Sequence, residues 1–447
     1  MVLTFLLQML SAVYDGALYL FTFLFLLVFI LWVIRVLLSR KYHTWDTPYD
    51  TTTAVIIPVV DEPVELFDAV LKRIKEQHPT EIIVVINGKR NENLEQVCKD
   101  NKVNFTWTEI PGKRNAIVVG LDYISSEIAV LVDSDTVWTP NTLKELVKPF
   151  RNHKVGGVTT QQHILQPERN RWTRWAEWLE SVRNMYSMPA MSVLGTVGCL
   201  PGRTIALRTS IIENNKVKFM TDKFLGVHLE VSDDRTLTNY ALKDGYKTVY
   251  QESSIVYTDA PTTLKVLAKQ QYRWARGSQY NTMRMMWWML RHAPVLALFY
   301  LADILIPFLV VGAFLAWAVR VIFQLKAANP YSGMLYVVGD TLIMAILLYL
   351  FSILTSWLFA AVRFQRPISK NPKEFWFLPY YMFLNIFLLV PIRLFGFMRS
   401  AHLSGWGTRK GGYQGEKKQN ILVIVPYMIT FILLGLSVWF GMVFYGG

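Results

Sequence analysis

The sequence predicts two parts with different folds: an α/β domain built on a parallel sheet, and a region of membrane helices. Of the 447 residues, 52% are hydrophobic and only 18% are charged, whereas a soluble domain has about 25% charged residues. Several apolar stretches reach the ~20 residues that a membrane-spanning helix needs. Between them lies a block of mixed polarity in which strand-like and helix-like patterns alternate.

Composition excludes several classes of protein. The apolar content excludes disorder, and two cysteines, Cys98 and Cys199, are too few for a disulfide scaffold. The net charge of +13 suits nucleic acid, anionic lipid or a phosphorylated substrate. Much of the excess lies beside the apolar stretches, where the positive-inside rule explains it. Nucleic-acid binding is therefore not predicted.

Four apolar stretches are predicted to cross the membrane. They are residues 17–38, 294–319, 335–362 and 421–443. The first is too long for a cleaved signal peptide, and no small-residue cleavage site follows it. Asp303 and Asp340 lie inside two of these stretches, so each carboxylate should face a polar cavity or a partner helix.

A fifth apolar stretch, residues 375–398, is interrupted by prolines and by Arg393, and cation-rich segments flank it on both sides. If both flanks obey the positive-inside rule, the stretch lies along the inner surface of the membrane. A kinked crossing helix is the alternative. The block at 39–293 begins with Arg40 and Lys41, so we place it in the cytoplasm, where cysteines stay reduced.

This block reads as alternating strands and helices. The expected strands cover residues 52–60, 81–88 and 127–136, and the expected helices cover 65–77, 91–101 and 113–125. Continuous apolar strands separated by helices predict a parallel sheet covered on both faces. Ligands of such sheets bind beyond the carboxyl ends of the strands, which is where Asp133, Ser134 and Asp135 stand.

Three acidic or basic motifs in this block offer chemistry. Asp133 and Asp135 supply hard oxygen ligands for Mg²⁺ or Mn²⁺, which could neutralise a diphosphate leaving group; a turn or helix cap is the alternative. Lys113 and Arg114 open a helix and suit phosphate, unless they form a solvated helix start. One residue of the Asp233-Asp234 pair could be a general base, with helix capping as the alternative.

Two further motifs lie near the membrane. Residues 269–280 (KQQYRWARGSQY) place an aromatic face beside donors for anionic oxygens, which suits a sugar acceptor next to a diphosphate. An interfacial anchor is the alternative. Residues 404–410 (SGWGTRK) form a basic, glycine-punctuated loop, for which an ordinary solvated loop is the alternative.

In chain order the motifs are DEP, DSD, CLPGR, SDDR, QQYRW and WGTR. This set resembles the processive family-2 glycosyltransferases, namely the hyaluronan, chitin and cellulose synthases and related capsule-type synthases. The resemblance runs from about Thr51 to Arg409. WGTR together with the DDR form is more similar to hyaluronan synthases than to cellulose synthases, although the QxxRWARG pattern is shared with the latter.

The resemblance implies a GT-A-like (Rossmann-like) cytoplasmic domain, with amphipathic interface helices and a helical transmembrane region. It implies boundaries at 1–38 for the first membrane segment, 39–293 for the glycosyltransferase domain and 294–447 for the remaining membrane region. The implied activity is inverting polymerisation of a UDP-activated sugar with Mn²⁺ or Mg²⁺, at the plasma membrane. The implied donors are UDP-GlcNAc, UDP-glucuronate or UDP-glucose, and the acceptor is the nascent polysaccharide.

The resemblance also assigns roles to individual residues. On the donor side it implies Asp135 as metal ligand, with Asp133 near the nucleotide, and nucleotide contacts from Lys113, Arg114, Gln270 and Arg273. Asp234 would be the general base, beside Asp233. Trp274 would stack under the acceptor sugar, and the turn that contacts it would contain Cys199, Leu200, Pro201 and Gly202. A gating loop would contain Trp406, Thr408 and Arg409.

The chain departs from the pattern at two places. Asn87 stands where the family often has an acidic residue that contacts uracil, so an amide would have to make that contact. One clear span precedes the cytoplasmic block, where hyaluronan synthases commonly have two, because residues 1–14 are too short to cross. That predicts an N-terminus outside the cell.

Three other activities stay open at this stage. One is a non-processive transferase that adds a single sugar to a lipid such as polyprenyl phosphate. Another is a cellulose-type or other β-glucan synthase. The third is a membrane transporter or receptor with a domain that senses sugar nucleotides. Sugar identity, linkage and oligomeric state are not predicted.

Overall fold

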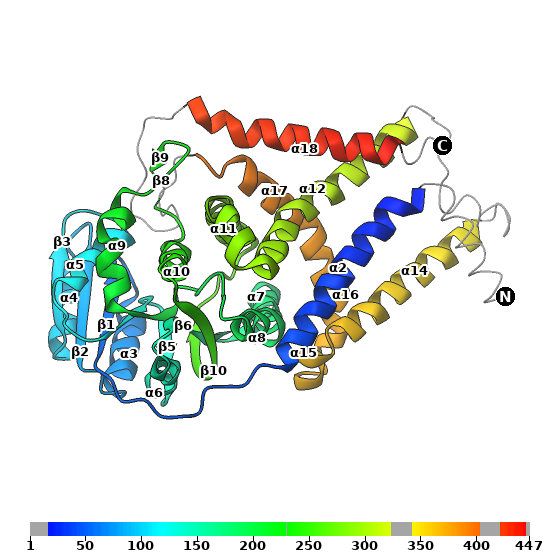
Figure 1. The fold of residues 1–447 in the computed structure, drawn as a ribbon. Coiled ribbons are helices and arrows are strands. Elements are labelled where there is room, and N and C mark those ends of the chain that lie inside the picture. The colour runs from blue at the N-terminus through cyan, green and yellow to red at the C-terminus, as the bar shows by residue number, and fades with distance from the viewer. Residues whose placement is uncertain (1–16, 229, 323–341, 403–420, 444–447) are drawn as a thin grey trace. The chain divides into compact units, whose positions relative to one another are not determined.

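The computed structural model describes residues 17–228, 230–322, 342–402 and 421–443 (Figure 1). The chain divides into two compact units. The sheet unit contains residues 35–298 and 399–423, and the helical unit contains residues 1–34, 299–398 and 424–447. Each unit is considered by itself.

The sheet unit is built on eight strands in the order β3-β2-β1-β4-β7-β6-β10-β5 (Figure 1). The strands are β1 (Thr53–Val59), β2 (Glu81–Asn87), β3 (Asn104–Thr108), β4 (Ile128–Val132), β5 (Thr136–Trp138), β6 (Val155–Ile164), β7 (Thr204–Arg208) and β10 (Lys247–Thr258). A separate hairpin joins β8 (Lys223–Phe224) to β9 (Val227–His228).

Helices cover both faces of this sheet. One face packs on α3 (Val64–Lys75), α4 (Glu92–Asp100) and α6 (Thr142–Val147), and the other packs on α5 (Lys113–Leu121), α9 (Thr209–Thr221) and α10 (Asp233–Lys243). Alternate residues of β1 point to opposite faces, so Val55 and Ile57 join the first core while Ile56 joins the second. Burial on both faces explains the continuous apolar run in this strand.

The predicted parallel strands are confirmed, and the sheet contains one feature that was not predicted. β2, β1 and β4 pair in parallel, as do β2 and β3. β7, however, is inserted antiparallel between β4 and β6. Because β7 runs the opposite way, its first residue, Thr204, pairs with Val132 at the carboxyl end of β4. The segment that precedes β7 is thereby brought to the acidic edge of the sheet.

The sheet unit is completed by α7 (Arg171–Val182), α8 (Met188–Val193) and the long α11 (Leu264–His292). Shorter helical turns are η1 (Lys148–Arg151), η2 (Pro167–Arg169) and η3 (Arg183–Ser187). The capping box at Asn170 starts α7, because its side chain accepts from Trp172 and Thr173 N–H groups while Thr173 bonds back to the Asn170 N–H.

The apolar stretches are helical wherever they are described. These helices are α2 (Ala17–Arg40), α12 (Pro294–Ile322), α14 (Leu342–Arg363), α15 (Gln365–Lys370), α16 (Glu374–Leu384), η4 (Asn385–Leu389), α17 (Val390–Met398), η5 (Ile421–Val423) and α18 (Ile424–Val443). Among the described residues, three helices have the length and composition to cross a membrane: Pro294–Gly312, Glu374–Met398 and Ile421–Trp439. Asp340, within the span predicted at 335–362, lies outside the described residues.

The stretch predicted to lie along the membrane surface forms one 25-residue helix, Glu374–Met398. A π-helical turn at Asn385–Leu389 continues it between its two prolines. Its length also fits the alternative of a kinked crossing helix, so the surface placement stays a prediction. Within the same unit, Asp303 of α12 faces a partner helix as predicted, because its Oδ1 lies 3.9 Å from Nη1 of Arg393 on α17.

Gly120 marks the closest packing of α5 on the sheet and generates a prediction. A Cβ atom at this position would lie 2.6 Å from Cγ2 of Ile56. We expect Gly120→Ala to destabilise the protein by about 1–3 kcal/mol, because the crowded core must shift to admit the methyl group. The same substitution at Gly435 in α18 meets nothing within 4 Å and serves as the control. Equal thermal unfolding midpoints for the two variants would contradict this account.

Candidate active site

The acidic residues after β4 lie at the carboxyl edge of the sheet, where the sequence places them. The Asp133 N–H donates to the Arg203 carbonyl at 3.0 Å, which joins this edge to the residue before β7. The Ser134 hydroxyl donates to Oε1 of Glu62, at the end of β1, at 3.0 Å. Carboxylates from two neighbouring strands therefore gather at one edge of the sheet.

The donor set at this edge fits a hard divalent cation. Asp133 and Asp135 supply carboxylate oxygens, while no group of three or more potential metal ligands occurs among the described His, Cys, Asp and Glu side chains. Mg²⁺ characteristically binds through one or two carboxylates, with substrate phosphates and waters completing its shell. Asp135 and Asp133 would hold such a cation together with a phosphorylated ligand.

Lys113, in the first turn of α5, forms an ion pair with Asp133. Burial works to lower the pKa of Lys113, but the charges of Asp133, Asp233 and Asp234 outweigh it and hold the pKa above its ordinary value. The side chain therefore stays an ammonium at neutral pH. A cation beside Asp133 is suited to a diphosphate, and the phosphate contact expected for Lys113 stays a prediction.

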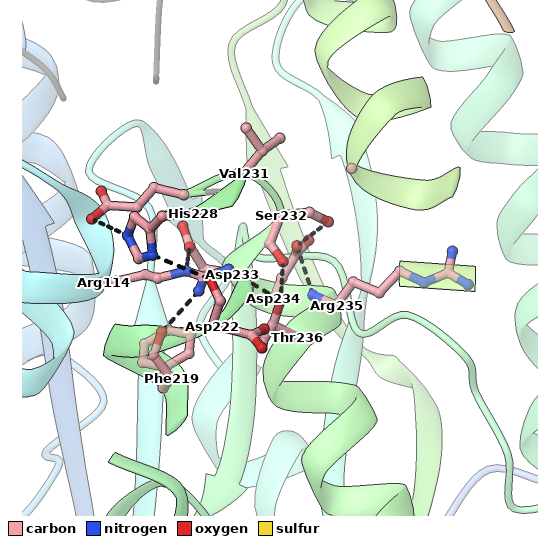
Figure 2. Close-up of polar contacts among 12 residues, drawn as sticks. Arg114, Phe219, Asp222, His228, Val231, Ser232, Asp233, Asp234, Arg235 and Thr236 are labelled. Carbon is pink, nitrogen blue, oxygen red and sulfur yellow. Dashed lines mark hydrogen bonds and ion pairs between the residues drawn. The ribbon is translucent and has the colours of Figure 1, made fainter. Parts of the chain in front are cut away.

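Asp234, in the first turn of α10, is held by a set of short contacts (Figure 2). It accepts hydrogen bonds from the Gly202 N–H at 3.0 Å, the Ser232 hydroxyl at 3.2 Å and the Arg235 N–H at 2.8 Å. The Cys199 thiol lies 4.0 Å from Oδ2 of Asp234. Burial, and then the charge of Asp234, raises the pKa of Cys199 to about 12, so this thiol stays protonated.

Gly202 lies close to both Lys113 and Asp234. A Cβ atom at Gly202 would lie 3.3 Å from Nζ of Lys113 and 3.3 Å from Cβ of Asp234. A second tie fixes the same turn to α10, because the Leu200 N–H donates to Oγ1 of Thr238 at 3.0 Å. The segment predicted to contact the acceptor therefore lies between the ammonium and the carboxylate.

Arg114 and Asp233 form a buried ion pair (Figure 2). Nε of Arg114 donates to Oδ1 of Asp233 at 2.8 Å, and Nη1 donates to the Phe219 carbonyl at 2.8 Å. The Arg114 and Asp233 side chains are only 1% and 8% exposed. A guanidinium so enclosed is held in place by its carboxylate. This geometry favours a supporting role for both residues, and the nucleotide role expected for Arg114 and the catalytic role expected for Asp233 stay predictions.

Asn87 is also enclosed, with an exposed fraction of 0%. Its amide donates to the Val59 carbonyl at 3.2 Å and accepts from the Gly112 N–H at 3.1 Å. These bonds join the end of β1 to the start of α5, directly before Lys113. The Asn87 side chain thus supports the backbone at this edge of the sheet, and the uracil contact expected for it stays a prediction.

Two residues of α11 border a pocket within the sheet unit: Trp274, predicted to stack under the acceptor sugar, and Gln270, predicted to contact the nucleotide. Gln270 and Trp274 line it together with Arg203 and Glu180. The Arg203 guanidinium lies 5.8 Å from the Trp274 ring centroid and pairs with Glu180 at 2.8 Å. An aromatic ring beside amide, carboxylate and guanidinium groups has the chemistry to bind a sugar.

The remaining predicted site residues belong to the turn before Gly202, to α11 and to residues 404–410. Pro201 accepts from Nε2 of Gln162 at 3.0 Å, which supports the turn before Gly202. Arg273 lies on α11, one residue before Trp274, and is half-buried. Trp406, Thr408 and Arg409 lie outside the described residues.

Sequence reasoning missed three residues that organise the site: Glu62, Arg203 and Thr238. Glu62 and Arg203 stand inside the DEP and CLPGR motifs, and Thr238 follows the SDDR motif by three residues. Glu62 bonds Ser134, Arg203 bonds Asp133 through its carbonyl, and Thr238 bonds Leu200. The sequence offered one signal, a polar residue in or near a motif. It did not indicate the hydrogen-bonding partner of that residue, which lies far away in the chain.

Comparison with known proteins identifies the family. The family described as "Glycosyltransferase like family 2" matches residues 50–277. The hyaluronan synthase of Streptococcus pyogenes serotype M3 is 27% identical over 393 residues, which cover 85% of this chain and 88% of that protein. A type 2 glycosyltransferase of Zymoseptoria tritici is 24% identical over 396 residues, covering 86% of this chain and 80% of the relative.

Among solved structures, a mannosyltransferase from Pyrobaculum calidifontis, in complex with GDP-Man and Mn²⁺, is similar in fold. Its TM-score is 0.54 at 17% sequence identity, with 85% of this chain and 96% of that chain covered. This confirms a GT-A-like mixed α/β domain with additional apolar helices. The chain therefore belongs to glycosyltransferase family 2, as a nucleotide-sugar-dependent enzyme distantly related to the hyaluronan synthases.

Proposed function

We propose that this enzyme is a processive, inverting glycosyltransferase that polymerises a UDP-activated sugar and passes the polysaccharide across the plasma membrane. The observation that carries the proposal is the convergence of Lys113, Gly202 and Asp234. It supports a reaction in which Lys113 is the cation for the leaving diphosphate and Asp234, across the same turn, is the base for the acceptor. The catalytic domain would be cytoplasmic, and the product would leave between membrane helices.

The proposed reaction needs one proton transfer and one displacement. Asp234 takes the proton of the acceptor hydroxyl, whose oxygen attacks the anomeric carbon of the donor in line. The bond from that carbon to the diphosphate oxygen breaks, and UDP departs from the opposite side. Lys113, which is held cationic by its acidic neighbours, stabilises the charge that develops on the diphosphate.

The remaining predicted groups act around this centre. Mn²⁺ or Mg²⁺ bound at Asp135 and Asp133 would neutralise the diphosphate. Gln270 and Arg273 would contact the pyrophosphate, and Trp274 would stack under the terminal acceptor sugar. Trp406, Thr408 and Arg409 would close over the nucleotide. The apolar helices and the relation to hyaluronan synthases over most of the chain support a membrane synthase.

Product analysis tests the proposed function directly. Purified protein in lipid vesicles should release UDP from labelled UDP-GlcNAc, UDP-glucuronate or UDP-glucose, supplied singly and in pairs. Label should enter a long chain that a linkage-specific hydrolase degrades. Addition of a single sugar to a polyprenyl phosphate lipid would instead identify a non-processive transferase. No UDP release from any of the three donors would contradict the proposal.

The neighbouring aspartates of α10 should respond differently to substitution. Asp234→Asn should retain UDP-sugar affinity within a few-fold, while turnover falls by roughly 10²–10⁴, the usual contribution of a general base. Asp233→Asn should instead destabilise the protein by about 3–5 kcal/mol, because it leaves the buried Arg114 charge uncompensated. Steady-state kinetics and thermal unfolding measure the two effects. The assignment of base and support would be reversed if the two variants exchanged these behaviours.

Asp135 provides the test of the metal assignment. Asp135→Asn should weaken UDP binding measured with Mn²⁺ or Mg²⁺ present, and change it little in a chelator, because the substitution removes a carboxylate ligand. Calorimetric titration with UDP, with and without the cation, gives both values. Glu127→Gln, at the opposite end of β4, is the matched control. A cation effect of equal size in Asp135→Asn and wild-type protein would remove the assignment.

A further inference from the structure

Arg235, the last residue of the Ser-Asp-Asp-Arg motif, reaches from α10 to α11 with a buried guanidinium, 2% exposed. Its Nη1 donates to Oγ of Ser278 at 2.8 Å, and its Nη2 donates to Oγ1 of Thr282 at 2.7 Å. Ser278 and Thr282 are four residues apart and therefore neighbours on one face of α11. The planar guanidinium thus forms hydrogen bonds with two successive turns of α11.

Around this guanidinium the helices meet partly through small groups, beside the buried Tyr280 of α11, whose hydroxyl lies 3.5 Å from Oγ1 of Thr236 on α10. A Cβ atom at Gly277 would lie 2.6 Å from Cβ of Ser232, at the start of α10. Farther along, Nδ2 of Asn239 donates to Oδ1 of Asn281 at 2.9 Å. Large side chains that interlock as ridges and grooves fix how one helix lies along another, and glycine and serine provide little of this. A slip of α11 by one residue, about 1.5 Å along its axis, would break the geometry of both Arg235 hydrogen bonds.

Both ends of this tie adjoin the candidate site. The Arg235 N–H donates to Oδ1 of Asp234 at 2.8 Å. On α11, Ser278 follows Trp274 by four residues, and Arg273 stands one residue earlier. Because a helix transmits displacement along its axis, the positions of Arg273 and Trp274 relative to Asp234 depend on where α11 is held.

The chemistry of the tie favours a geometric role over a stabilising one. Burying a guanidinium carries a desolvation penalty of several kcal/mol, and a well-packed apolar side chain often stabilises as much or more. What the guanidinium adds is direction, since its donors lie in one plane at fixed separation. A lysine at this position would keep the positive charge but not the planar arrangement of donors.

We propose that Arg235 is a positioning residue that sets the register of α11 against α10, and so holds Arg273 and Trp274 at the reacting distance from Asp234. The inference rests on the proposed function, because it assumes that Asp234 and Trp274 act on the acceptor while Arg273 contacts the leaving diphosphate. A slipped α11 would leave the acceptor hydroxyl out of line with the anomeric carbon. Water would then attack that carbon, and UDP-sugar plus water would give UDP and free sugar.

The test measures how much released UDP is matched by sugar in the polymer. In Arg235→Lys, sugar incorporation should fall about 10–100-fold, the effect of a displacement near 1 Å. UDP release should fall less, so the ratio of UDP released to sugar incorporated should rise several-fold. UDP-sugar affinity should fall less than sugar incorporation, because Lys113, Asp133 and Asp135 are unaltered and only the contacts from α11 are displaced.

A matched control separates positioning from general stability. Arg208 is also buried, and its guanidinium donates to the carbonyls of Val155 and Phe150 and pairs with Glu127. Arg208→Lys should lower the unfolding midpoint yet leave the ratio of UDP to incorporated sugar unchanged. A rise of equal size in both variants would overturn the positioning role.

A variant pair on α11 keeps the inference testable if Arg235→Lys fails to fold. Ser278→Ala combined with Thr282→Val removes the two acceptors and should raise the same ratio. Adding it to Arg235→Met should change the ratio little further, because the interacting groups are already lost. Additive effects, or an unchanged ratio in a polymerising Arg235→Lys enzyme, would contradict the positioning role alone. Absence of UDP release by the wild-type enzyme would contradict the proposed function instead.

Discussion

The buried ion pair between Arg114 and Asp233 is the interaction on which the geometry of the site depends. It joins the first turn of α5 to the first turn of α10, although 119 residues separate the partners in the chain. Nη2 of Arg114 extends the contact to Oγ1 of Thr236 at 3.3 Å. Removing either charge would leave the other buried without its counterion, which costs far more than the pair contributes.

The residues next to this pair carry the proposed chemistry. Lys113 precedes Arg114, and Asp234 follows Asp233, so fixing the inner pair also fixes the outer residues. Consecutive residues on a helix point about 100° apart. One residue of each pair can therefore face the core while its neighbour faces the site.

The antiparallel strand β7 supplies the third part of this arrangement. A parallel strand after β4 would begin at the far edge of the sheet and would leave Gly202 remote from Asp133. Antiparallel pairing instead sets Thr204 opposite Val132, and the Arg203 carbonyl accepts from Asp133. Gly202 has no side chain, so its backbone can pass between Lys113 and Asp234 without displacing either.

The fold was predictable where local patterns determine structure. The apolar, β-branched run predicts the strand β1, and sequence periodicity predicts the helix that starts at Lys113. Each element ends where polar residues begin. The direction of β7 was not predictable in this way, because a five-residue strand carries no record of the strand it pairs with. The chemical class of the site also followed from the sequence, since motif order identifies the family.

Roles within each motif were less accessible. Asp233 and Asp234 are chemically identical neighbours, and only the position of Arg114 distinguishes them. Asn87 stands at a strand end, where a ligand contact is reasonable, yet its amide is satisfied by the Val59 and Gly112 backbone. Such partners come from distant parts of the chain, so a motif indicates which residues matter before it indicates what each one does.

The two ion pairs that begin α5 show why lysine and arginine stand in this order. In the Arg114–Asp233 pair the side chains are 1% and 8% exposed, and several fixed acceptors surround the guanidinium. In the Lys113–Asp133 pair they are 12% and 29% exposed. An ammonium is a compact point charge without a preferred plane, so it can turn from one oxygen to another with little loss. A partly exposed lysine beside aspartates is therefore suited to exchange a carboxylate for a diphosphate. The enclosed arginine would instead hold α5 and α10 in place during that exchange.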